Sequence, residues 1–166
     1  MRTALRTAFA ALAIVGLLVT PALAQTELSN EELGATVSMP DGWSEVEGND
    51  RAAFNFKEEA SHSQVEIIAT PLMTPDVADV FFDTFHATLT SSEFTQTGRE
   101  EKSYGDHTGL ETIYSFSHSG VDLKVTVFQF VNDTTAWLVV SYVQADQFDA
   151  FAETFSTIVG SLAFAG

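Results

Sequence analysis

A run of four consecutive apolar residues, Trp137-Leu138-Val139-Val140, constrains the fold of this chain more than any other feature. The run lies within a predicted strand, residues 136–143, and the side chains of a strand point alternately to opposite faces of a sheet. Both faces of that strand must therefore be covered by other apolar groups. A sheet covered on both sides needs a layer of helix or hairpin on each side.

Alternating apolar and polar residues predict the other strands. Segment 35–39 follows a polar lead-in, residues 25–34, and stops at the turn sequence Pro40-Asp41-Gly42. Segment 43–47 follows that turn, so the two segments are predicted to pair as an N-terminal hairpin. The remaining strands are predicted at 52–57, 64–70, 97–102, 110–116 and 121–127.

The spacing of apolar residues predicts a first amphipathic helix that begins with Thr74 as the N-cap and Pro75 in the first helical position. Its opposite, polar face would carry Asp79, Asp83 and His86. The helix is expected to lie on the sheet by one broad stripe of apolar side chains, namely Val77, Phe81, Phe85 and Leu89, flanked by Ala78 and Phe82.

A second helix is predicted after Asp146, which is placed as its N-cap with Asp149 three residues on. This helix supplies the layer on the other face of the sheet. Its apolar side chains follow helical spacing and are Phe148, Phe151, Ala152, Phe155, Ile158, Val159 and Leu162.

The first 24 residues have the pattern of a secretory signal: Arg2 and Arg6 precede an apolar stretch, residues 8–19, and small residues end at Ala24. We predict cleavage after Ala24, which leaves residues 25–166 as one domain in the periplasm or outside the cell. The stretch is shorter than the roughly 20 apolar residues of a spanning helix, and Pro21 interrupts it. An uncleaved N-terminal anchor is the alternative.

The chain has no cysteine, so apolar packing and not disulfides must stabilise it. Residues 25–166 carry five basic and 23 acidic side chains, a formal net charge of −18. Nucleic acids and anionic membranes are bound through Lys and Arg, so neither is an expected partner. We interpret the acidic surface as a solvated one, with attraction of divalent cations or of a basic partner as the alternative.

Candidate site residues are few. Asp79, Asp83 and His86 are spaced to share one side of the first helix, as half of a divalent-metal site or as a solvated polar face. The other histidines, each next to a predicted turn or a polar neighbour, are interpreted as surface residues: His62, His107 and His118.

Motifs of catalysis and cofactor binding are absent from the sequence: there is no Gly-x-Ser-x-Gly, no His-Glu-x-x-His, no glycine-rich phosphate loop and no calcium-loop pattern. We therefore predict no catalytic residue, no cofactor and no metal ligand. A hydrolase whose Ser/His/Asp site is assembled by the fold is the alternative. Trp43 is expected in the core, and an exposed contact surface is the alternative for it.

Three segments resemble the PsbP-like superfamily, which includes the extrinsic P subunit of photosystem II. They are Ala35-Thr36-Val37-Ser38-Met39-Pro40-Asp41-Gly42-Trp43, Ile67-Ile68-Ala69-Thr70-Pro71-Leu72 and Phe151-x-x-x-Phe155-x-x-Ile158-x-x-Ser161-Leu162. The resemblance implies an α+β fold, an antiparallel β-sheet of about six strands sandwiched between helices, and a binding or assembly role. A photosystem role is not expected, because only residues 25–34 precede the first strand and positive charge is scarce.

Taken together, the sequence predicts an exported, monomeric, non-catalytic accessory or binding module of the bacterial envelope. Its expected partner is a protein, and no membrane insertion is expected after signal cleavage. The alternatives are a weak hydrolase with an unmarked Ser/His/Asp site and an acidic protein that binds divalent cations.

Overall fold

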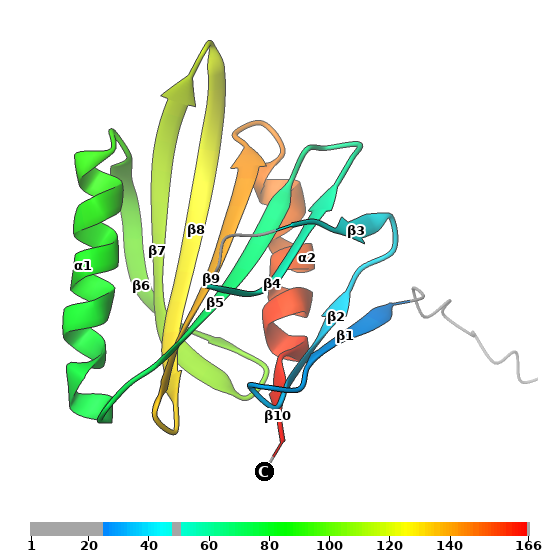
Figure 1. Ribbon diagram of the computed structural model, residues 1–166. Helices are drawn as coiled ribbons and strands as arrows, with labels where there is room; N and C mark the ends of the chain where they lie inside the picture. Colours follow the sequence, from blue (N-terminus) through cyan, green and yellow to red (C-terminus); the bar gives the residue numbers. More distant parts are fainter. Residues whose placement is uncertain (1–24, 48–50, 166) are drawn as a thin grey trace, which may run out of the picture.

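The structure, a computed structural model, describes residues 25–47 and 51–165, so the predicted export signal lies outside the described residues. The described part has two α-helices, one 3₁₀ turn and ten strands (Figure 1). In chain order they are β1 (Thr26–Asn30), β2 (Ala35–Met39), β3 (Trp43–Glu45), β4 (Ala52–Glu58), β5 (Gln64–Pro71), η1 (Pro75–Val77), α1 (Ala78–Ser91), β6 (Thr95–Tyr104), β7 (His107–His118), β8 (Val121–Asn132), β9 (Thr135–Gln144), α2 (Phe148–Ser161) and β10 (Ala163–Phe164).

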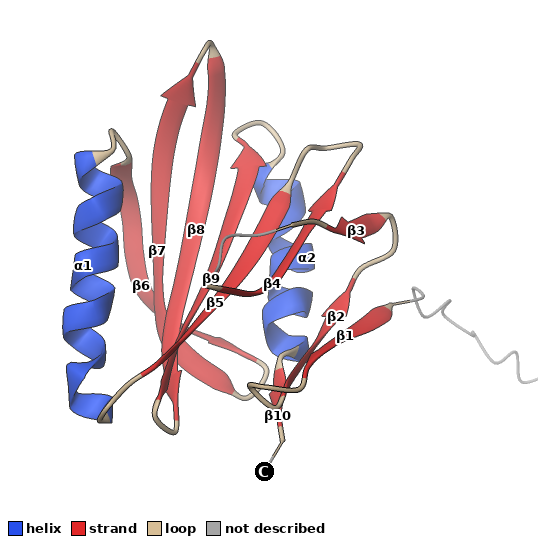
Figure 2. Cartoon of the chain, in the orientation of Figure 1, coloured by secondary structure: helices blue, strands red, loops and turns tan. Residues whose placement is uncertain are grey.

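The strands form two sheets (Figure 2). The large sheet is antiparallel and has seven strands in the order β3-β4-β5-β9-β8-β7-β6. The small sheet has the order β1-β2-β10. The α+β class is confirmed, but the sheet is larger than the expected six strands, and the sequence did not predict a second sheet.

The predicted N-terminal hairpin of segments 35–39 and 43–47 is wrong. Strand β2 pairs with β1, with Leu28 opposite Val37, whereas β3 pairs with β4, with Trp43 opposite Glu58. Gly42 has a φ of 82°, a conformation that glycine adopts without steric strain, and there the chain leaves one sheet for the other. The supposed polar lead-in therefore contains a strand, β1, which covers one edge of β2.

Each central strand alternates between two apolar cores, as the run at 137–140 predicted. In β9, Trp137 and Val139 belong to the core that includes α2, whereas Leu138 and Val140 belong to the core that includes α1. Neighbouring residues of a strand point to opposite faces. The two helices therefore cover opposite faces of the large sheet, with β2 packed into the α2 core (Figure 1).

Helix α1 buries one flank of the broad stripe that was predicted, and not its centre. Thr74 and Pro75 do begin a helical segment, but its first turn is the 3₁₀ turn η1, and α1 itself starts at Ala78. Phe81 and Phe85, assigned to the buried stripe, lie half-buried at its edge. The buried side chains are Ala78, Phe82 and Leu89, all three within the predicted broad stripe, and His86, which was assigned to the polar face.

Helix α2 agrees more closely with its prediction, since it starts after Gln147, one residue beyond the predicted N-cap. Five of its seven predicted apolar side chains are buried, including Leu162 at the C-cap, whereas Phe148 is half-buried and Ala152 is exposed. Trp43 is only 9% exposed, and its ring centroid lies 5.9 Å from that of Phe151. The core interpretation of Trp43 is therefore confirmed.

Candidate functional site

The three residues assigned to one polar face of the first helix, Asp79, Asp83 and His86, do not lie together, so the prediction that His86 belongs to that face is wrong. Asp79 and Asp83 are exposed, whereas His86 points toward the sheet and is 8% exposed. Within residues 25–47 and 51–165, no group of three or more His, Asp or Glu side chains could hold a metal ion.

His86 links α1 to the large sheet. Its Nδ1 lies 2.5 Å from the hydroxyl of Tyr114 on β7, and its Nε2 contacts Oε1 of Gln129 on β8. A neutral imidazole has one donor and one acceptor nitrogen, so Nε2–H donates to the amide oxygen while Nδ1 accepts from the phenol. Both ring nitrogens are thereby satisfied in a buried position, which allows a polar residue to lie in the apolar stripe.

The remaining histidines have different surroundings. His62 is exposed, as expected, with a φ of 56°. His107 is half-buried, so its assignment to the surface is wrong: Nε2 donates to the carbonyl oxygen of Leu162 at 2.6 Å, and the ring stacks on Phe130. The side chain of His118 lies outside the described part. The bonded partners of His86 and His107 are thus amide, phenol and backbone groups, not the serine and carboxylate of a hydrolase triad.

A buried carboxylate, that of Glu111, faces α2. It accepts a hydrogen bond from the hydroxyl of Tyr104 and lies 3.7 Å from Nζ of Lys102, which is 3.1 Å from Glu100. Burial and the bond to Glu111 raise the pKa of Tyr104, and the bond to Glu100 raises the pKa of Lys102. Both groups therefore hold their protons more firmly than usual, which is unsuited to proton transfer near neutral pH.

The tyrosines give a testable pH dependence. Burial raises the pKa of Tyr104, Tyr114 and Tyr142, the three tyrosines of the chain. The folded state thus favours the neutral phenol, and this stabilisation is complete below the unfolded pKa of about 10 and is lost as the pH rises through the folded values. Absorbance titration at about pH 10.5 should show far less tyrosinate in the folded protein than in urea. Equal absorbance would contradict the burial of these phenols.

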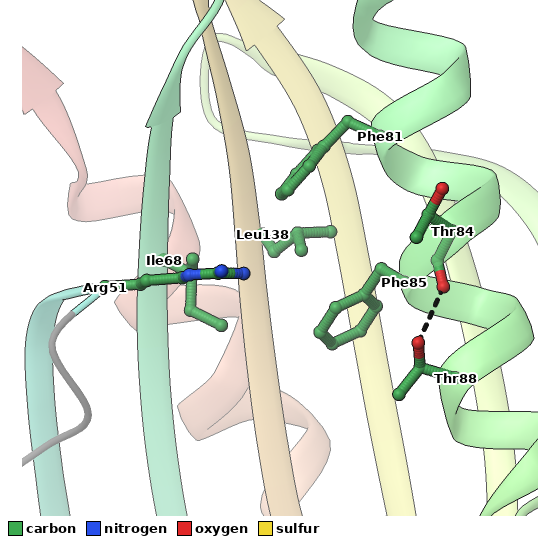
Figure 3. A pocket seen from close by; sticks show the side chains of 7 residues that line it. All are labelled: Arg51, Ile68, Phe81, Thr84, Phe85, Thr88 and Leu138. Atoms are coloured by element: carbon green, nitrogen blue, oxygen red, sulfur yellow. Dashed lines mark hydrogen bonds between the residues drawn. The ribbon is translucent and has the colours of Figure 1, made fainter.

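An apolar hollow lies beside α1, and we name it the α1 groove. It has a volume of about 530 Å³ (Figure 3). Its floor comes from β5 and β9 and its wall from one side of α1, and Arg51, the residue immediately before β4, completes the lining. The lining residues are Arg51, Ile68, Phe81, Thr84, Phe85, Thr88 and Leu138.

The groove follows from the way α1 is anchored. The bonds of His86 hold the helix over β7 and β8, so the neighbouring Phe81 and Phe85 face β5 and β9 across a gap. In Figure 3 both rings point from α1 toward Leu138, and the side chain of Arg51 extends toward it from the other side. Arg51 alone among the lining residues is charged.

A second feature of the same region is a group of three exposed apolar side chains at the start of α1. We name this group, Met73, Val77 and Val80, the rim patch. Met73 is 96% exposed, Val80 68% and Val77 42%. Three large apolar side chains exposed within eight residues are more than the scattered single ones of an ordinary surface. The sequence pattern did not predict this patch or the groove, because Val77, Phe81 and Phe85 were assigned to the core and Met73 and Val80 lie outside the predicted stripe.

Neither helix in the described residues is long and apolar enough to cross a membrane. A scan of the sequence against protein-family models finds no match, and a search of curated proteins finds no significant one.

Solved structures do match. The cyanobacterial PsbP of Synechocystis aligns with a TM-score of 0.61 at 13% identity, over 94% of this chain and 98% of that one. The fold is PsbP-like. LpqN of Mycobacterium tuberculosis, described as involved in cell envelope biogenesis, has a TM-score of 0.59 at 13% identity over 86% of this chain and 91% of its own.

A third structure with the PsbP-like fold is the Ran-binding protein Mog1p of Saccharomyces cerevisiae. It aligns with a TM-score of 0.55 at 12% identity, over 86% of this chain and 96% of that one. At such identities the likeness establishes the fold alone, because one fold carries many functions. The resemblance to the PsbP-like superfamily found in the sequence is confirmed at that level.

Proposed function

We propose that residues 25–166 are an exported, monomeric, non-catalytic binding module of the bacterial envelope, which binds a protein partner through the rim patch. The single observation that carries this proposal is the exposure of Met73, Val77 and Val80 within eight residues at the start of α1. Two proteins with this fold have described roles: Mog1p is Ran-binding, and LpqN is involved in cell envelope biogenesis. The first description supports a binding role and the second supports a place in the envelope.

The surroundings of the rim patch indicate the kind of partner. Asp76, Asp79 and Asp83 are exposed on η1 and α1 beside the apolar residues. Protein interfaces combine an apolar centre with a polar periphery, and complementary charge speeds association and selects partners. We therefore propose a partner that places apolar side chains on the patch and basic side chains around it.

The alternatives have less support. A hydrolase needs a nucleophile beside a base, yet His86 and His107 have other bonded partners. Cation binding needs converging carboxylates, and the described residues offer no such cluster. We propose neither function.

Photocrosslinking tests the proposal. A photoreactive amino acid at position 80 should give a discrete crosslinked product in the native envelope fraction, and the same amino acid at exposed position 150 on α2 serves as the matched control. The product should disappear in a Met73→Ser/Val77→Ser background and weaken at high salt, because the surrounding charges are screened. Equal crosslinking from positions 80 and 150 would overturn the assignment of the rim patch.

A further inference from the structure

We infer that the α1 groove is a binding site for a single-chain alkyl carboxylate, whose head group binds Arg51 and whose chain lies along Phe81 and Phe85. This inference goes beyond the proposed function, because it requires no protein partner. It rests on the lining of the groove, its charge and its connection to a second hollow.

The lining suits an alkyl chain. The volume of about 530 Å³ is within the range of ligand pockets, about 300–1,000 Å³. The hydroxyls of Thr84 and Thr88 donate to backbone carbonyls of α1, those of Val80 at 2.7 Å and Thr84 at 2.9 Å. The wall therefore directs no hydroxyl proton into the groove, and an occupant needs no hydrogen-bonding groups along its length.

The charge of the groove selects the head group. Residues 25–166 have only five basic side chains against 23 acidic ones, and one of the five, Arg51, lines the α1 groove. A guanidinium presents five N–H donors in a planar fork that matches the two oxygens of a carboxylate. Arg51 also has a contact within the protein, and five donors allow it to keep that contact while it binds a ligand.

A second hollow, also of about 530 Å³, indicates which way round the ligand lies, that is, where its head group and its chain are placed. It shares Arg51 and Phe81 with the α1 groove and extends past the end of β5 to the end of β1 and the turn that follows, where Asn30 and Glu32 line it. Arg51 thus lies between the α1 groove and a hollow of mixed lining, in which Asn30, Glu32 and Thr70 add polar groups to apolar ones. An amphiphile would place its chain in the α1 groove and its head beside Arg51.

Calorimetric titration of the purified protein with decanoate, below micellar concentrations, tests the inference. We expect saturable binding with one site per chain. Octanoate, two methylenes shorter, should bind about 15-fold more weakly, since each buried methylene contributes about 0.8 kcal/mol. Decyltrimethylammonium has the same chain with the opposite charge and should bind at least about tenfold more weakly than decanoate.

Two variants locate the site. Arg51→Gln removes the charge and should weaken decanoate binding by about tenfold or more, whereas Lys57→Gln, at the other end of β4, should leave it unchanged. Thr84→Trp fills the groove from the helix wall without removing a core side chain and should abolish binding. An unchanged affinity in Arg51→Gln, or equal binding of the cationic amphiphile, would overturn the inference. Crosslinking from position 80 in the Arg51→Gln background reports on the proposed function separately.

Discussion

Replacing Phe155 with alanine is expected to lower the free energy of unfolding by about 3–5 kcal/mol. Phe155 is 4% exposed on the buried face of α2. Its ring meets that of Tyr104 edge to face, with centroids 5.7 Å apart, and that of Phe151 at 6.3 Å. Truncation removes these contacts and leaves a cavity against the large sheet, whose paired strands are poorly able to close it. Urea unfolding followed by circular dichroism measures the loss.

Phe148→Ala is the matched control, since it removes the same side chain from the same helix. Phe148 is only half-buried in the first turn of α2, so we expect a loss of about 1 kcal/mol. Equal losses for the two variants would contradict the assignment of the buried face. A loss below about 1 kcal/mol for Phe155→Ala would do the same.

The strands of the large sheet could be predicted from sequence because their side chains alternate. The predicted segments 110–116, 121–127 and 136–143 lie within β7, β8 and β9, which extend further at one or both ends. A period of two leaves a readable pattern wherever the two faces of a strand differ in burial. The apolar run at 137–140 likewise indicated cover on both faces.

Strand pairing could not be predicted in the same way. Strand β2 has buried residues at alternate positions, but its partners are the polar β1 and the two-residue β10, more than 100 residues later in the chain. Those partners contribute backbone hydrogen bonds, which leave no mark in the sequence. A turn signal after β2 therefore suggested the wrong neighbour.

The candidate site was missed for a related reason. The stripe of Val77, Phe81 and Phe85 is more apolar than that of Ala78, Phe82 and His86, so hydrophobicity alone selects the first. The structure selects the second because His86 finds partners 28 and 43 residues further along the chain. That rotation of α1 places two phenylalanines in the α1 groove.

Trp43→Ala should also lower the free energy of unfolding by about 3–5 kcal/mol. The indole meets Phe56 of β4 edge to face at 5.7 Å and Phe151 of α2 at 5.9 Å. Trp43 is the first residue of β3, the strand that follows the small sheet in the chain, and its ring packs this short edge strand against α2. Loss of the ring should weaken both attachments, and hydrogen exchange of β2 and β3 amides should increase more than that of β8. Urea unfolding measures the total effect.

Trp43→Phe keeps an aromatic ring, so we expect it to lose less than half as much stability as Trp43→Ala. Comparing the two variants separates the contribution of the ring contacts from effects on the backbone. A loss within about 0.5 kcal/mol of zero for Trp43→Ala would place the indole on the surface.

The rings of Trp43 and Phe155 both contact Phe151. Residues that share a partner are energetically coupled, and Phe151 has more freedom to fill the space when both neighbours are truncated. The double alanine variant should therefore lose less than the sum of the two single losses, whereas strict additivity would mean that the three rings do not form one core.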